Sequence, residues 1–226
     1  MNSDPGPIAW EDGETPFPAN FGLTWWECLG SPQAFFSRVS WGEPFSRPLL
    51  YFLVVGILAS ALGLFWFVWG PWGTAGEYGL TLEVRFLSFF LTPFALLIAL
   101  GLISLALHLF VLLLAPDRRG LGATATVLCY GSGVGLVSAV LPPAIGLVGP
   151  APGVFRAAYL VLYVMLTLAV QVWYVAVLVI GIRKAHSVTT GRAAAIVLLP
   201  LAIGLILTVV LVMVAVALIA LADLPV

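Results

Sequence analysis

Residues 193–221 read AAAIVLLPLAIGLILTVVLVMVAVALIAL, a run without a single charged side chain. About 20 residues of helix suffice to cross the hydrocarbon core of a bilayer, so this run is long enough to span one. Runs of similar character precede it, at 48–69, 86–115, 121–148 and 157–182. The sequence therefore predicts an all-α polytopic membrane protein with five transmembrane helices and a membrane domain over residues 48–222.

The composition supports the same interpretation. Hydrophobic residues make up 62% of the chain and charged residues 8%, whereas soluble domains have about 45–50% and about 25%. This excludes a water-soluble globular domain as the main body of the chain. We expect no cleaved signal peptide, because the first long apolar run begins only at Pro48.

The basic residues indicate how the spans are oriented. Seven of the nine lie on one predicted side of the membrane: Arg38, Arg47, Arg118, Arg119, Arg183, Lys184 and Arg192. Cytoplasmic loops carry an excess of Lys and Arg, so we expect the N-terminus in the cytoplasm and the C-terminus outside. The Ala-, Gly-, Val- and Arg-rich composition is typical of bacterial proteins, and we expect the bacterial cytoplasmic membrane as the location.

Two kinds of segment precede the first span. Residues 1–20 are rich in Pro, Gly and acids, which predicts a flexible tail. Residues 21–47 are aromatic and predict an amphipathic segment with a short helix beginning at Ser31-Pro32. We expect this segment to lie in the membrane interface, and packing against the spans is the alternative. The predicted interface residues are Trp25, Trp26, Phe35, Phe36 and Trp41.

Prolines and small residues modulate the spans. Pro93 predicts a kink in the second span, and Pro142-Pro143 predicts that the third span is not straight at its outer end. Small residues at helical spacing predict close helix packing, with a homodimer face as the alternative. These residues are Gly56, Ser60 and Gly63 in the first span, and Gly131 and Gly135 in the third. Both cysteines, Cys28 and Cys129, are expected to be free thiols.

Reactive side chains are few. His108 lies deep in the second span, where an ionisable residue is a functional candidate, although a bond to a carbonyl, to Tyr130 or to Gln171 would satisfy it without any further role. No Asp or Glu lies inside a span, which disfavours ion-coupled transport. His186 falls in a connector that we interpret as a cytoplasmic basic hairpin: Arg183, Lys184, His186 and Arg192. We therefore expect no enzyme, catalytic residue, cofactor, metal or nucleic-acid partner.

Three sequence elements carry a family resemblance. They are Ser31-Pro32-Gln33-Ala34-Phe35-Phe36, the Pro48-Leu49-Leu50 entry into a Gly-punctuated span, and the hairpin 179–193, which reads VIGIRKAHSVTTGRA. In these elements the chain resembles the Yip family, the Ypt/Rab-interacting membrane proteins, in its bacterial branch. The resemblance covers about residues 20–222. It implies five spans, a cytoplasmic N-terminus and an outer C-terminus.

Two functional hypotheses follow. The first is a non-enzymatic membrane protein that organises, shapes or scaffolds the membrane through its aromatic segment and basic hairpin. The alternative is a small channel or permease with a path near His108 and Tyr130. The expected partners are membrane lipids, other membrane proteins or a second copy of this chain.

Overall fold

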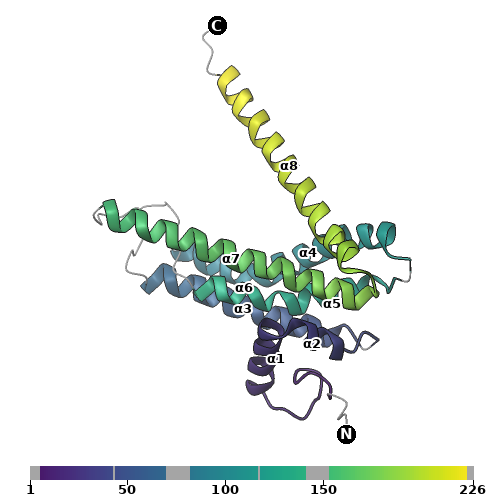
Figure 1. Cartoon of the computed structure of the whole chain (residues 1–226). Coiled ribbons are helices and arrows are strands. Elements are labelled where there is room, and N and C mark those ends of the chain that lie inside the picture. Colours follow the sequence, from purple (N-terminus) through teal and green to yellow (C-terminus); the bar gives the residue numbers. More distant parts are fainter. Residues whose placement is uncertain (1–5, 43, 70–81, 117, 141–152, 223–226) are drawn as a thin grey trace.

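The computed structural model describes residues 6–42, 44–69, 82–116, 118–140 and 153–222, and this part of the chain is helical (Figure 1). Five of its segments are long and apolar enough to cross a membrane, which confirms the predicted fold class. They are formed by α3 (Ser46–Trp69), α4 (Leu82–Leu114), α5 with α6 (Leu121–Gly131 and Gly133–Val140), α7 (Gly153–His186) and α8 (Thr190–Ala222).

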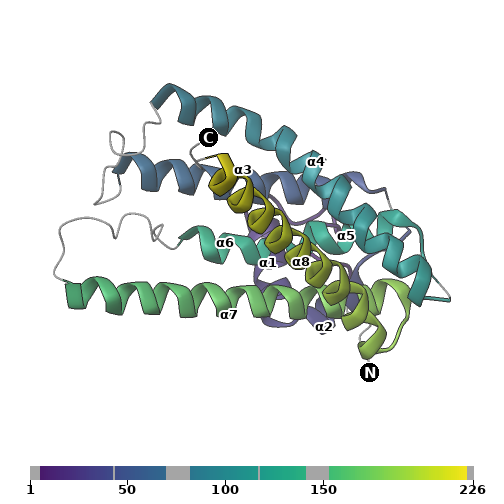
Figure 2. The same ribbon diagram turned by 90° about the horizontal axis from the view of Figure 1, so that it is seen from above.

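Helix α5 is the centre of the bundle. It packs against α3, α4 and α7, and all its residues from Ala123 to Gly131 are buried. In the most apolar stretch of the α5–α6 span 67% of the residues are buried within the protein, against 11–28% in the corresponding stretches of the other four spans. Helix α8 packs on α7 and α4 near its start and then leaves the bundle (Figures 1 and 2). Its side chains from Leu201 to Ala215 are exposed and, apart from Thr208, apolar, as expected of a surface that faces lipid.

The predicted third span is interrupted earlier than expected. Helix α5 ends at Gly131 and α6 begins at Gly133, with Ser132 between them. Glycine is a poor helix former, and the Ser132 hydroxyl donates to the Cys129 carbonyl at 2.7 Å, which competes with the helical bonds. The predicted break at Pro142-Pro143 lies outside the described residues. Pro93 lies within the first half of α4, and Figure 2 shows that this helix is not straight.

Two short helices lie ahead of the spans, α1 (Ala19–Gly30) and α2 (Pro32–Arg38). Helix α2 begins at the expected proline, and an ion pair between Arg38 and Glu27 ties the two helices together. Helix α2 packs on α7, and α1 packs on α5 and α6. We call residues 6–42 the N-terminal layer, and Figure 1 shows it along the side of the bundle.

The expectation of a flexible tail over residues 1–20 is wrong for residues 6–20. Ile8 is fully buried and Glu11 is 7% exposed. Trp10 donates from its ring nitrogen to the Arg47 carbonyl at 2.7 Å and from its backbone to Thr24 Oγ1 at 3.1 Å. A few large side chains thus hold a segment whose average composition predicted disorder.

The hairpin between α7 and α8 is shorter than expected. Helix α7 continues to His186 and α8 begins at Thr190. Ser187 adopts a left-handed backbone (φ 52°) that ends α7, and the Val188 N–H returns to the Arg183 carbonyl at 3.3 Å. Most of the predicted hairpin is therefore helix.

Candidate functional site

Four of the six buried polar side chains of the described chain lie around α5, at the end of the bundle where α3, α5 and α8 begin and α4 and α7 end: Glu11, Thr124, Thr126 and His186. Arg47, Arg118, Arg119, Arg183 and Lys184 also lie at these helix ends, and we call this the basic end. Three features occupy it: a carboxylate bound by Tyr130, a chain of two histidines and a threonine, and an open cavity.

Glu11 brings a carboxylate into the bundle from the N-terminal layer. The Tyr130 hydroxyl donates to its Oε1 at 2.6 Å, and the Ser40 N–H donates to its Oε2 at 3.1 Å. The Arg47 guanidinium donates to the Glu11 backbone carbonyl. A buried carboxylate is stable only when it is paired or hydrogen-bonded. The donors from Tyr130 and Ser40 satisfy one oxygen each, and Arg47 brings a positive charge to the same residue through its backbone carbonyl. Glu11 lies outside the predicted spans, where a buried acid was not expected.

Aromatic rings surround Tyr130. The rings of Phe35 and Tyr51 lie 5.3 Å from it between centroids, and Phe35 meets Phe36 edge-to-face at 5.1 Å. Both phenylalanines are fully buried, so their predicted place in the membrane interface is wrong. The alternative, packing against the spans, is what the structure has.

The other predicted interface residues divide between core and surface. Trp25 turns inward and donates from Nε1 to the Gly133 carbonyl at 2.7 Å, and Trp41 is half-buried, stacked near Phe36. Trp26 alone among the five is largely exposed, at 67%. Burial raises the pKa of the neighbouring Cys28 thiol to about 12.

The second polar cluster joins His108, Thr124 and His186, from α4, α5 and α7. Thr124 Oγ1 lies 3.0 Å from His108 Nδ1 and 3.0 Å from His186 Nε2, and the Arg119 N–H donates to His186 Nδ1 at 3.2 Å. Because that N–H is a donor, His186 Nδ1 accepts and its proton is on Nε2. His186 therefore donates to Thr124, whose hydroxyl donates to His108. This chain of bonds fastens the ends of three helices.

This arrangement corrects two expectations. His186 is 1% exposed and belongs to the core, not to a solvated hairpin. His108 is bound by Thr124 and not by Tyr130 or Gln171. Thr124 and Tyr130 are six residues apart, so at about 3.6 residues per turn they lie on different faces of α5. Gln171 is exposed and lines a separate, mostly apolar cavity of about 290 Å³ between α4, α7 and α8.

Only some of the glycines that were predicted to allow close helix packing lie against a neighbouring helix. A Cβ added to Gly56 would lie 2.1 Å from the Leu96 side chain, and one added to Gly131 would lie 3.0 Å from Leu178. Gly63 and Gly135 have open space, and the Ser60 hydroxyl donates to the Gly56 carbonyl at 2.8 Å. Two further close approaches were missed. Added Cβ atoms at Gly133 and Gly181 would lie 2.5 Å from the Tyr51 hydroxyl and 2.4 Å from Val127.

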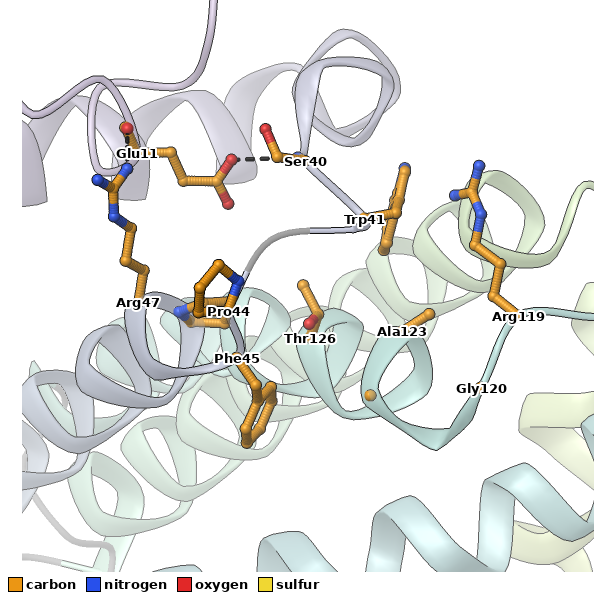
Figure 3. Close-up of a pocket in the computed structure, with 12 residues that line it drawn as sticks. Glu11, Ser40, Trp41, Pro44, Phe45, Arg47, Arg119, Gly120, Ala123 and Thr126 are labelled. Atoms are coloured by element: carbon orange, nitrogen blue, oxygen red, sulfur yellow. Dashed lines mark hydrogen bonds between the residues drawn. The ribbon is translucent and has the colours of Figure 1, made fainter.

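A cavity of about 320 Å³ opens at the basic end. Glu11 and Arg47 lie at one end of it, and Trp41 and Arg119 at the other (Figure 3). The Arg119 guanidinium carbon lies 5.5 Å from the centre of the Trp41 ring, a cation–π distance. The floor is the start of α5: the N-cap Gly120, Gly122 and Ala123 of the first turn, and Thr126 of the second.

Comparison with known proteins assigns the chain to a family. A family model described as the Yip1 domain matches residues 26–220, which include the end of α1, all of α2 to α7 and nearly all of α8. No curated protein and no solved structure matches the chain. The match covers most of the sequence and coincides with five helices long enough to cross a bilayer. The chain therefore belongs to the Yip family of integral membrane proteins.

Proposed function

We propose that this protein is a non-enzymatic organiser of membrane shape, and that its N-terminal layer widens the molecule within one leaflet. The observation that carries the proposal is the place where the layer is attached. Trp25 is bonded to Gly133, which lies twelve residues beyond the start of α5 at Leu121. At 1.5 Å per residue this is about 18 Å along the axis, whereas each headgroup layer is only about 5–8 Å thick.

The outer face of α1 has the chemistry that such a position requires. Leu23 and Trp26 of α1 are one helical turn apart and are 49% and 67% exposed, and Phe17, just ahead of the helix, is 66% exposed. The opposite face is buried, with Thr24 and Cys28 against the bundle. An amphipathic helix whose outward face is apolar is stable beside lipid and costly in water.

A layer of this kind gives the protein an asymmetric cross-section. The half of the bundle nearer the basic end is accompanied by α1, α2 and residues 6–18, and Figure 1 shows the far halves of α3 and α7 extending beyond this layer. Additional protein volume in one leaflet favours curvature of the membrane in which that leaflet is on the convex side. With the positive-inside orientation, the cytoplasmic leaflet is the expanded one.

Reconstitution into vesicles tests the proposal. We expect the purified protein to convert large vesicles into smaller or tubular ones, measured as a diameter distribution by electron cryomicroscopy. Leu23→Gln with Trp26→Gln should weaken this effect, because polar side chains disfavour insertion of α1. The matched control is Leu113→Gln, which places the same change on the exposed surface of α4, where Leu113 is 78% exposed. Unchanged vesicles with the wild-type protein would reject the proposal.

The alternative of a solute path is not favoured by any particular contact. His108, Tyr130 and Gln171 occupy separate environments, so they do not line one passage within the described chain. We therefore propose the membrane-shaping role alone.

A further inference from the structure

The cavity at the basic end has the features of a binding site for an anion. We propose that its Trp41–Arg119 end binds the phosphate of an anionic phospholipid headgroup. This inference does not depend on the proposed shaping of the membrane.

The distribution of charge within the cavity favours this end. Among the described residues that line it, Glu11 is the one acid, and its carboxylate oxygens accept hydrogen bonds from the Tyr130 hydroxyl and the Ser40 N–H. Arg47 lies beside Glu11 and offsets its charge (Figure 3). The guanidinium of Arg119 lies at the opposite end, held near the Trp41 ring. Arg119 therefore supplies a positive charge that can bind an anion at the end of the cavity away from the Glu11 carboxylate.

The floor of the cavity supplies uncharged donors. Helix α5 begins there, and its N-cap residue Gly120 offers no side-chain cap. The first N–H groups of a helix have no acceptor within the helix and attract anions. Thr126 lines the same floor and is 8% exposed. Within the described residues its hydroxyl has no hydrogen-bond partner, and its side chain rises from α5 toward the cavity (Figure 3).

The position of the cavity indicates a lipid as the source of the phosphate. It lies between the first turn of α3, at Arg47 and Pro48, and the first turn of α5. Beyond these turns neither helix carries a charged side chain in its described residues, and both belong to predicted membrane spans. This is the depth at which headgroup phosphates lie beside a transmembrane helix. Arginine forms bidentate bonds with phosphate oxygens, and a neighbouring aromatic ring prefers the same layer.

The test compares two neighbouring arginines in the full-length protein. The purified chain in detergent micelles is titrated with short-chain phosphatidylglycerol, or with phosphatidylcholine of equal chain length, and bound lipid is counted by native mass spectrometry. Arg119→Gln should weaken binding of phosphatidylglycerol by about tenfold or more, the factor expected for a charge-assisted hydrogen bond. Arg118→Gln, which removes an exposed charge outside the cavity, should change it less than about twofold.

A second variant blocks the cavity sterically. An added Cβ at Gly122 would meet no atom within 4 Å, so the side chain of Gly122→Leu can begin without a clash and extend into the cavity that Gly122 lines. It should lower the affinity for phosphatidylglycerol as strongly as Arg119→Gln does, with an unchanged thermal unfolding midpoint as the check on folding. Equal losses in the Arg118 and Arg119 variants, or no loss in any variant, would overturn the proposal. Displacement of the lipid by inorganic phosphate at equal concentration would overturn the lipid assignment and identify a free-phosphate site.

Discussion

Replacing Tyr130 with phenylalanine should loosen the N-terminal layer without displacing the helices. The change removes a 2.6 Å hydrogen bond to the buried Glu11 carboxylate and leaves that oxygen without its donor. A hydrogen bond to a charged group contributes about 1.5–3 kcal/mol. At about 1.4 kcal/mol per factor of ten, the population in which the layer is detached should rise about 10- to 100-fold.

The reactivity of Cys28 reports this population. Its thiol is 1% exposed, lies in α1 and is 3.5 Å from the Tyr130 carbonyl, and burial raises its pKa to about 12. Alkylation therefore requires local opening of the layer. The rate, followed at neutral pH by mass spectrometry of the peptide that contains Cys28, should rise by the same factor in Tyr130→Phe.

The control is Tyr163→Phe in α7, where the ring stacks on Tyr159 away from this cluster. It should leave the Cys28 rate within about twofold of that of the wild type. Equal rates in Tyr130→Phe and the wild type would show that the Glu11 bond does not hold the layer. A rise in both variants would show that opening does not involve this cluster in particular.

Three further changes have defined outcomes. Gly181→Ala places a Cβ 2.4 Å from a methyl group of α5 and should lower the free energy of unfolding by about 1–3 kcal/mol. The control Gly204→Ala places its Cβ in open space and should not lower the free energy of unfolding. Thermal unfolding in detergent compares the two variants. Thr124→Val removes the hydroxyl that joins His108 to His186 and should lower the free energy of unfolding by about 1–3 kcal/mol. Thr124→Ser keeps a hydroxyl and should retain most of this stability. Hydrogen bonds from Thr15 lower the pKa of the Asp12 carboxyl group. The stability that these bonds give the turn is therefore present above the ordinary carboxyl pKa and is lost as the pH falls through the lowered pKa of Asp12. NMR titration of the Asp12 carboxyl group checks this, and Thr15→Val should raise the pKa of Asp12.

The spans could be predicted from sequence because length and hydropathy depend only on the chain itself. Helix α2 was also found at its Ser31-Pro32 start. The sequence could not decide whether an apolar helix face packs against lipid or against the rest of the protein. Phe35 and Phe36 form the stripe that a lipid surface would select, but a protein core selects the same stripe, and the structure buries both.

The polar contacts were missed for a related reason. Glu11 is a distant acid in a segment that composition marks as disordered, yet it meets Tyr130, 119 positions later in the chain. His186 was placed in a hairpin because charged residues surround it, whereas its helix continues through them. Thr124, a β-branched residue within an apolar helix, was the available signal for the histidine chain. Its two partners became apparent only when three helices were assembled.

The depth of α1 is the most direct test of the account. A nitroxide attached to Trp26→Cys, in the protein reconstituted into lipid nanodiscs, collides with oxygen in hydrocarbon or with a water-soluble nickel complex in solvent. If the N-terminal layer lies within the leaflet, oxygen will broaden the spectrum and nickel will have little effect. Strong broadening by nickel, equal to that of a label on a solvated loop, would contradict it.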